Sequence, residues 1–259
     1  MSFSVRQVHD ITRTVEGWLT DAEAILLWFL SATSGGKGFI VEVGSWKGKS
    51  TIWLAYGSKA LGREKVVAID PHAGTTEHRR LRGGTSTYDE FLQNLALSGV
   101  SDWVTPIIGY SQEVAQGWVG NPRLIFIDGS HEYGNVKQDF RLWFELLGNG
   151  GIIALHDCYF YKKPLHEGPG RVVQRLLLQS PFAAHVGFLE SITFCKKEKV
   201  GALNRARNRL LRLMLNLSRE TAIPRVALLL CLLLDATDIE TLRTVLWTYW
   251  QAIKLRWFA

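Results

Sequence analysis

The sequence predicts an α/β fold: a doubly wound, mostly parallel seven-stranded sheet with an antiparallel hairpin, followed by a C-terminal helical extension. Five apolar runs of strand length alternate with stretches of helical spacing, an order that gives parallel strands joined by helical crossovers. Two later runs, at about residues 185–190 and 192–196, are too close for a crossover and are expected to pair as a hairpin. Three of the parallel runs end on an acid, at Asp70, Asp128 and Asp157, which places carboxylates at the carboxyl edge of the sheet.

The 259-residue chain is long enough for one large α/β domain with additions at both ends. We expect a helical cap at residues 1–35, the α/β domain at 36–199 and a basic helical extension at 200–259. The extension has nine Lys or Arg and four Asp or Glu, so it holds most of the net charge of +6. Because the remainder is close to neutral, the sequence does not indicate a nucleic-acid-binding protein.

The features that report on location predict a cytoplasmic protein. The three cysteines, Cys158, Cys195 and Cys231, are far apart and form neither a disulfide framework nor a zinc-binding spacing, which is typical of a reducing compartment. The first residues carry charges where a secretory signal has an apolar core. No apolar run reaches the roughly 18–20 residues that a membrane-spanning helix needs.

Residues 39–55 are the part of the sequence on which the other predictions depend, because they run from a buried strand through a glycine turn into a helix. The strand ends at Gly44, the turn passes through Gly48, and helical spacing resumes at Ile52. This order brings backbone N–H groups and a helix N-terminus to the carboxyl end of a parallel strand. Open α/β sheets bind nucleotide-like ligands at that position.

The turn differs from the known phosphate-binding patterns. The spacing Gly44-x-x-x-Gly48-Lys49-Ser50 is one residue shorter than a Walker A loop, and the turn lacks G-x-G-x-x-G. Glu42 precedes the first glycine by two residues, and a carboxylate there repels phosphate but favours a cationic or amino-group ligand. A P-loop-like nucleotide hydrolase stays open as an alternative, because Lys49 follows the glycine and a later strand ends on an acid.

The second strand supplies an acid in the position of a ribose ligand. It ends at Asp70, 22 residues after Gly48, and in Rossmann-like units an acid roughly 20 residues after the glycines binds ribose hydroxyls. His72 opens a loop rich in Gly, Thr and Arg that extends to Thr87, and we expect this loop to lie beside the ligand. After the third strand, Ser111 is expected to cap the next helix.

Two further strand ends carry residues suited to metal binding and acid–base chemistry. The fourth strand ends at Asp128 and is followed by His131, and the fifth ends at His156 and Asp157. We expect these ends to be neighbours, so the oxygen-rich set of Asp128, His156 and Asp157 predicts a divalent-cation site, with Mg²⁺ favoured. A cation there lowers the pKa of a substrate hydroxyl. Asp139 is expected either to orient His131 or to lie on the surface.

With Glu42, the glycine turn and Asp70 in place, residues 36–199 resemble the class I S-adenosylmethionine-dependent methyltransferases, which have this Rossmann-like sheet. The resemblance implies S-adenosylmethionine as the cofactor, a zwitterion with a sulfonium charge and no phosphate. It also implies that the end of the third strand borders the adenine ring. The residues expected at the cofactor are Glu42, Gly44, Ser45, Gly48, Ser50, Thr51, Asp70, His72, Ser111, Gln112 and Asp128.

The spacing Asp128-x-x-His131 is similar to that of catechol-type O-methyltransferases, in which the strand-end acid binds metal and a residue three positions later is the base. The resemblance implies that Asp128 and His131 are catalytic, with histidine in place of the usual lysine. The stretch Asp-Gly-Ser-His-x-Tyr at 128–133 looks more like a bacterial branch that acts on sugars and other natural products. The implied reaction is metal-assisted methylation of a hydroxyl on a small-molecule or glycan acceptor. Cys158 stands where parts of that branch have a further acid.

The C-terminal extension predicts an interaction surface. Residues 203–217 alternate arginines and leucines at helical spacing, which is typical of a basic amphipathic helix. An apolar run at 227–234 is too short to span a membrane, and residues 241–258 are again amphipathic. We expect these helices to form a homodimer interface in preference to a peripheral membrane contact. A non-catalytic adaptor that uses this basic extension is the remaining alternative function.

Overall fold

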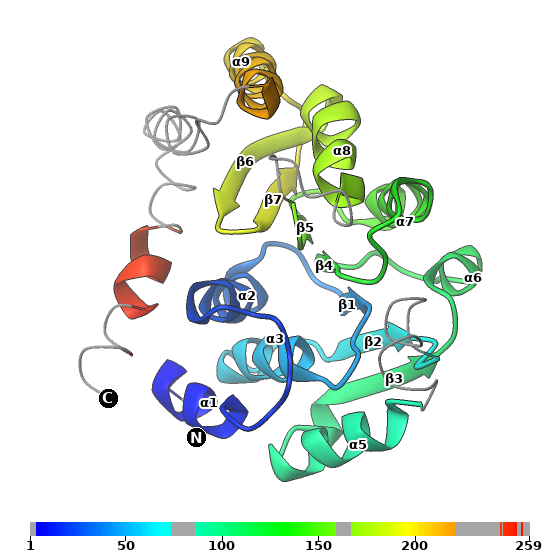
Figure 1. The fold of residues 1–259 in the computed structure, drawn as a ribbon. Coiled ribbons are helices and arrows are strands. Elements are labelled where there is room, and N and C mark those ends of the chain that lie inside the picture. Colours follow the sequence, from blue (N-terminus) through cyan, green and yellow to red (C-terminus); the bar gives the residue numbers. More distant parts are fainter. Residues whose placement is uncertain are drawn as a thin grey trace.

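The computed structural model has the α/β architecture that the sequence predicts (Figure 1). One sheet has the strand order β3-β2-β1-β4-β5-β7-β6. The first five strands of this order are parallel, and β7 runs antiparallel to both β5 and β6, so the expected hairpin is confirmed. The strands are β1 (Ile40–Val43), β2 (Val66–Asp70), β3 (Val104–Ile108), β4 (Leu124–Ile127), β5 (Ile152–Leu155), β6 (Ala183–Leu189) and β7 (Ile192–Lys197). The residues that the structure describes are 4–73, 86–158, 167–220, 244, 246–252 and 255.

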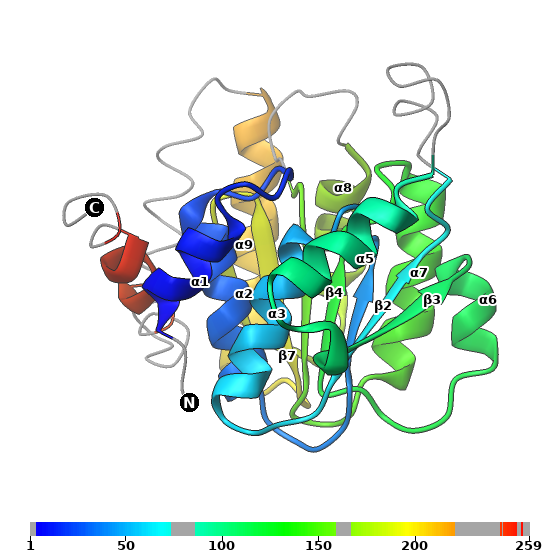
Figure 2. The ribbon, with the colours of Figure 1, turned by 90° about the horizontal axis from the view of Figure 1, so that it is seen from below.

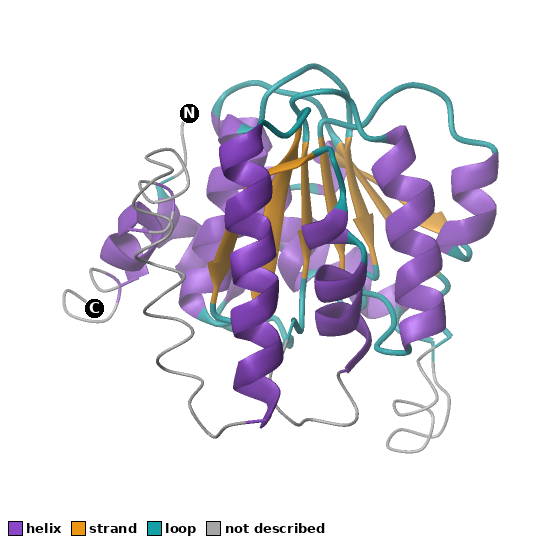
Figure 3. Cartoon of the chain, turned by 90° about the horizontal axis from the view of Figure 1, so that it is seen from above, coloured by secondary structure: helices purple, strands orange, loops and turns teal. Residues whose placement is uncertain are grey.

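Helices cover both faces of the sheet (Figures 2 and 3). One face packs against four helices and the described helical residues 246–252 in one apolar cluster, and the other face packs against four further helices in a second cluster. The first set is α1 (Val5–Thr12), α2 (Asp21–Thr33), α3 (Lys49–Ala60) and α5 (Tyr88–Leu97). The second set is α6 (Ser111–Gln116), α7 (Tyr133–Leu146), α8 (Glu167–Arg175) and α9 (Ala202–Glu220). Short 3₁₀ turns lie at Ser101–Trp103 and Leu177–Gln179.

Burial on both faces explains why β1, β2, β4 and β5 are almost continuously apolar in sequence, whereas the edge strand β3 is partly exposed. In β1, Ile40 packs in the cluster of α2 and α3, whereas Val41 and Val43 pack in the opposite cluster. Because side chains alternate along a strand, Glu42 shares the face of Ile40 and lies on the α3 side of the sheet. The one charged residue of the strand is thereby placed under the helix that follows the glycine turn.

The strand order reverses at β1, which pairs with β2 on one side and with β4 on the other. Such a reversal leaves a crevice at the carboxyl edge, because the connections after the two neighbouring strands leave on opposite faces. The segments that follow β1, β2, β4 and β5 begin at this edge. They carry most of the residues that the sequence analysis singled out.

Some local expectations are corrected by the structure. The helix expected near residues 171–178 is α8, which begins earlier, at Glu167, and ends at Arg175. Ser111 does not cap α6: the N-cap is Tyr110, and the hydroxyl of Ser111 donates a hydrogen bond to Asp139. The amphipathic helix expected at 203–217 is confirmed as α9. Most of the loop expected beside the ligand (74–85), the run at 227–234 and half of 241–258 lie outside the described residues, whereas residues 246–252 are helical.

The N-terminal segment is part of the same core as the sheet. Helix α2 begins with the expected capping box, in which the Glu23 N–H donates to Thr20 Oγ1 (3.2 Å) and the Thr20 N–H donates to Glu23 Oε2 (3.0 Å). Ile25 and Leu26 are fully buried in the cluster formed with α3. The boundary expected at residue 35 stays a prediction. Within the described ranges, no helix has both the length and the apolar character needed to cross a bilayer.

Candidate active site

The glycine turn after β1 requires glycine at two positions. Gly44 has a φ of +87°, and a Cβ atom there would lie 2.4 Å from the carbonyl oxygen of Asp128. Gly48 has a φ of +89° and is the N-cap of α3, where a Cβ would press on the ring of Phe91. Neither end of the turn has room for a side chain. At Gly44 the reason is the backbone that follows β4, which lies directly against the turn at the crevice.

Asp70 holds the turn in place. Its Oδ2 accepts hydrogen bonds from the backbone N–H groups of Ser45 (2.9 Å) and Trp46 (2.8 Å), and its Oδ1 accepts one from the N–H of His72 (2.7 Å). A carboxylate oxygen has two acceptor sites, so Oδ1 retains one for a ligand hydroxyl. Asp70 therefore has a structural role at the turn, and its expected role at the ribose stays a prediction.

Glu42 and Ser45 carry the polar atoms that a ligand of this turn would meet. Glu42 is fully buried, its Oε2 accepts a hydrogen bond from Thr51 Oγ1 (2.5 Å), and burial raises the pKa of its carboxyl to about 8, against hydrogen bonds from Ser50 and Thr51. Among the described residues, Glu42 Oε1 and Ser45 Oγ have no hydrogen-bond partner although both are buried. Both residues lie at the glycine turn, so a polar ligand bound there could pair with these two atoms.

Three of the residues expected at the cofactor have side chains that are engaged with other parts of the protein. The ring of His72 is buried against Tyr88 and Phe91, with Nδ1 3.0 Å from Thr87 Oγ1, and burial lowers its pKa, which favours the neutral ring. The side chains of Ser111 and Gln112 both donate hydrogen bonds to Asp139 Oδ1. That these three residues contact the cofactor stays a prediction. Because their side chains already bond within the protein, we expect them to act on the cofactor indirectly.

Asp139 is neither a surface carboxylate nor a partner of His131, so both expectations for it are wrong. Its side chain is 2% exposed and bound to the first turn of α6. Burial raises the pKa of its carboxyl to about 6, against the hydrogen bonds from Ser111 and Gln112. The acid thus joins α7 to α6 beside the crevice.

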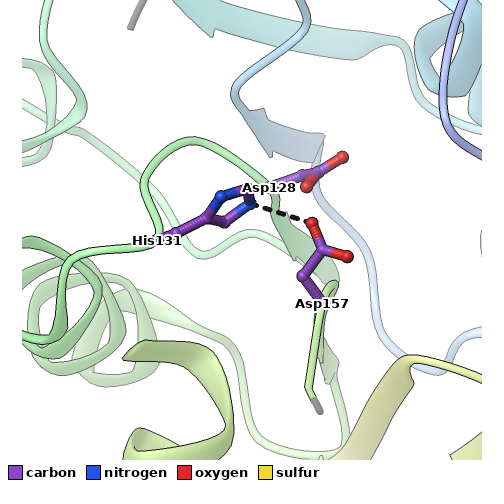
Figure 4. A group of neighbouring side chains, drawn as sticks. All are labelled: Asp128, His131 and Asp157. Atoms are coloured by element: carbon purple, nitrogen blue, oxygen red, sulfur yellow. Dashed lines mark ion pairs between the residues drawn. The ribbon is translucent and has the colours of Figure 1, made fainter. Parts of the chain in front are cut away.

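Asp128, His131 and Asp157 come together at the ends of β4 and β5 (Figure 4). One potential ligand atom from each lies within 4.8 Å of the others. His131 Nε2 is 2.8 Å from Asp157 Oδ2. Burial disfavours the charged ring, but the hydrogen bond and charge of Asp157 raise the pKa of His131 above its usual value. The pKa of Asp157 is lowered, because the two neighbouring histidines outweigh its burial.

His156 lies behind this group, buried among three carboxylates. Its ring is 3% exposed, with Nδ1 3.0 Å from Asp128 Oδ1 and 3.5 Å from Asp157 Oδ2, and with Nε2 3.5 Å from Glu23 Oε2. Burial opposes protonation, but the charge of Asp128 and the hydrogen bonds that the ring donates to the carboxylates raise the pKa of His156 well above its ordinary value. The expected role of His156 as a metal ligand stays a prediction, and His131 is a further residue of the group that could hold a cation.

Sequence reasoning missed Glu23, the third carboxylate around His156. Its side chain is 2% exposed, and its Oε1 accepts hydrogen bonds from the Ser191 N–H (3.0 Å) and the Ser191 hydroxyl (2.5 Å). The capping box predicts a glutamate at this position but explains only its bond to Thr20. The contacts with His156 and with the β6–β7 turn depend on the folded sheet, and no local sequence signal reports them.

Lys49 does not lie where the lysine of a P-loop lies. Its stem packs against Gly17, where an added Cβ would come within 2.9 Å of Lys49 Cβ and Cδ. Its side chain lines a small hollow together with Asp21 and Trp53, between α1, α2 and α3. A P-loop lysine instead reaches the β- and γ-phosphates over the turn. This placement argues against the nucleotide-hydrolase alternative.

We predict that Glu42→Gln makes the free energy of unfolding less dependent on pH. The folded protein keeps a proton on Glu42 up to about pH 8, whereas a glutamate in the unfolded chain ionises near its ordinary pKa of 4.5. This contribution to stability is present at low pH and is lost as the pH rises through about 8. Urea unfolding at pH 5.5 and 8.5 measures it, with a difference of at most about 3 kcal/mol between wild type and variant. Exposed Glu113→Gln is the matched control, and identical pH slopes for Glu42→Gln and wild type would contradict the account.

We predict that Glu23→Gln lowers the pKa of His156, because it removes one of the carboxylates that stabilise the imidazolium. The glutamine keeps the shape and the capping acceptor, so we expect a loss of about 1–3 kcal/mol in the free energy of unfolding. NMR titration of the histidine ring protons, with His156→Gln to assign the resonance, measures the pKa. An unchanged His156 titration would show that Glu23 has no electrostatic role; Glu113→Gln again serves as control.

The methyltransferase domain family matches residues 41–158. An uncharacterized protein of Acanthamoeba polyphaga mimivirus is 23% identical over 125 residues, which are 47% of this chain and 52% of that protein. The chain therefore spans about half the length of the curated relative that it matches.

Solved structures share the fold at low identity. Cofactor-bound Rv0187 from MTB superposes with a TM-score of 0.57 and 17% identity, over 76% of this chain and 88% of that chain. The O-methyltransferase from Bacillus cereus in complex with SAH superposes with a TM-score of 0.52 and 20% identity, over 74% of this chain and 89% of that chain. The O-methyltransferase TomG from Streptomyces achromogenes in complex with SAM superposes with a TM-score of 0.50 and 16% identity, over 75% of this chain and 87% of that chain. Residues 41–158 thus match the methyltransferase domain family, and the chain shares the fold of these solved structures.

Proposed function

We propose that this protein transfers the methyl group of S-adenosylmethionine to a hydroxyl of a sugar or another small natural product. The observation that carries the proposal is the group Asp128, His131 and Asp157, which lies at the same sheet edge as the glycine turn and its two unpaired buried atoms. An acid–imidazole pair beside a cofactor turn suits removal of a proton from an acceptor hydroxyl. The names of the Bacillus cereus and TomG structures, both O-methyltransferases, support the same reaction class.

The turn after β1 is proposed to hold the cofactor. Glu42 Oε1 and Ser45 Oγ would bind the amino group and neighbouring polar atoms of its methionine part, and the free acceptor site of Asp70 would bind a ribose hydroxyl. Gly44 and Gly48 allow the backbone to approach the ligand. Ser50 and Thr51 act indirectly, because both bond to Glu42. Ser111 and Gln112 are kept as neighbours of the adenine, positioned through Asp139.

His131 is proposed as the general base and Asp157 as the residue that orients it. The imidazole of His131 would take the acceptor proton, and its Nε2 lies 2.8 Å from Asp157 Oδ2. The acceptor oxygen then forms a bond to the methyl carbon as the carbon–sulfur bond breaks, so S-adenosylhomocysteine and a methyl ether are the products. The carboxylate of Asp157 stabilises the imidazolium that forms.

A divalent cation would be held by Asp128 and Asp157, with His131 as the third donor of the group. The donor set fits Mg²⁺, which needs only one or two protein carboxylates in addition to substrate and water. Bound there, a cation lowers the pKa of the acceptor hydroxyl. The two roles of His131 exclude each other: a nitrogen that coordinates the cation is not free to accept a proton.

The other predicted partners are proposals of the same kind. A cytoplasmic location and a homodimer formed through residues 200–259 rest on the sequence alone. The comparisons offer no support for the P-loop alternative or for a non-catalytic adaptor. No contact of the protein with nucleic acid is proposed.

We predict that S-adenosylhomocysteine binds the protein and that ATP with Mg²⁺ does not. Asp70→Asn removes the charge that holds the turn and faces the ribose, so affinity should fall about tenfold, or about 1.4 kcal/mol. Isothermal titration calorimetry measures the affinity of the protein for each of the two ligands. Asp102→Asn on the surface 3₁₀ turn is the matched control. Binding of ATP without binding of S-adenosylhomocysteine would overturn the cofactor assignment.

We predict that His131→Ala lowers turnover by about 10²–10⁴-fold while the affinity for S-adenosylhomocysteine stays unchanged, because the base acts on the acceptor and not on the cofactor. A screen of hydroxylated acceptors, read by the mass gain of one methyl group, supplies the assay, and His9→Ala is the control. Equal losses of turnover and affinity would contradict the base role.

The same assay tests the divalent cation. Loss of activity with EDTA and its recovery with Mg²⁺ would support a role for the cation in the reaction, and activity that is insensitive to EDTA would exclude that role.

A further inference from the structure

Helix α9 has one face fixed to the sheet. The Arg207 guanidinium donates to the carbonyl oxygen of Val186 (2.8 Å), and the Asn208 side chain donates to that of Ala183 (2.9 Å). Leu211 is fully buried in the same cluster as the sheet. These contacts hold the helix along β6 in one orientation, so its opposite face is defined.

The opposite face of α9 combines exposed leucines with exposed arginines. Leu203 is 77% exposed, Leu210 is 42% exposed and Leu213 is 55% exposed. Arg205, Arg209 and Arg212 are exposed beside them. At 3.6 residues per turn, the leucines line one side of this face and the arginines line the other.

Charge on this part of the chain has one sign. From residue 199 to residue 219 the sequence has six Lys or Arg and no Asp or Glu. An apolar stripe beside a row of arginines is what a helix needs to lie in the headgroup region of an anionic bilayer, with leucines among the acyl chains and guanidinium groups at the phosphates. The leucine side of the face thereby matches the acyl chains, and the arginine side matches the phosphate groups.

Two other occupants match only half of the face. A nucleic acid would pair with the arginines but would leave Leu203, Leu210 and Leu213 in water or against phosphates. A second copy of the chain, packed through the same face, would cover the leucines but would bring like-charged arginines together, since a two-fold interface pairs a patch with itself. Charge complementarity therefore favours an anionic lipid surface.

The position of α9 relates this face to the active site. The helix follows β7, which ends at the amino edge of the parallel strands, and runs back beside β6. Figures 2 and 3 show it extending toward the edge at which β4 and β5 end. A bilayer in contact with α9 would lie near the side of the protein where the acceptor enters.

We propose that the exposed face of α9, formed by Leu203, Leu210, Leu213, Arg205, Arg209 and Arg212, binds the surface of anionic membranes. This inference goes beyond the proposed methyl transfer, and its test needs no activity. It differs from the expectation that residues 200–259 chiefly form a dimer.

The test is sedimentation of the full-length protein with vesicles of phosphatidylcholine alone, or with one third phosphatidylglycerol, at 50 and 300 mM NaCl. We expect binding to the anionic vesicles that weakens with salt, and at least tenfold weaker binding to neutral vesicles. Both Leu210→Asp/Leu213→Asp and Arg209→Glu/Arg212→Glu should reduce the anionic binding at least tenfold. Leu97→Asp on α5 and Arg141→Glu on α7, both exposed elsewhere, are the matched controls, and unchanged thermal unfolding confirms that each variant is folded.

Several results would overturn the proposal. Absence of binding, or equal binding to both kinds of vesicle, excludes an anionic membrane surface. Equal losses in the control variants mean that this face has no special role. An effect of the arginine changes without an effect of the leucine changes, together with binding to duplex DNA, assigns the face to a polyanion. A monomer–dimer shift in gel filtration that only the leucine changes abolish assigns it to a second copy.

Discussion

The imidazole of His156 connects four parts of the molecule at the edge where chemistry would take place. It lies between Glu23 of α2 and the carboxylate that follows β4, and Glu23 in turn bonds to Ser191 in the β6–β7 turn. A buried charge without partners is costly, so the ring and the acids stabilise one another only as a set. The N-terminal helix is therefore needed at the site: it supplies one of the charges that balance the ring.

The charges at the crevice are arranged to suit a cationic cofactor beside an acceptor. Asp157 is paired with His131, and Asp128 with His156, so both of these acids already have an imidazole partner. The carboxyl of Glu42 has no such partner among the described residues, and burial raises its pKa to about 8. A sulfonium compound at the turn would favour loss of that proton, because a nearby cation lowers the pKa of a carboxyl. Cofactor binding and the ionisation of Glu42 are thus expected to be linked.

Local patterns in the sequence predicted most of the fold because apolar periodicity and glycine positions report directly on strands, turns and helices. The strand–turn–helix at 39–55 and the hairpin after residue 183 are of this kind. The candidate site was only partly predictable. The approach of Asp128 and Asp157 follows from the neighbouring strand ends, but the state of His156 depends on Glu23, which is distant in sequence and close only in the folded protein. The burial of the His72 ring was not predictable for the same reason, since the helix that covers it comes later in the chain.

The central claim is that the turn between β1 and α3 binds S-adenosylmethionine through its unpaired buried atoms. A crystal structure of the complex with S-adenosylhomocysteine tests it most directly. We predict that the amino group of the ligand lies within hydrogen-bond distance of Glu42 Oε1 or Ser45 Oγ, with a ribose hydroxyl at Asp70 Oδ1. A ligand bound at another edge of the sheet, with both atoms still unpaired, would contradict the account.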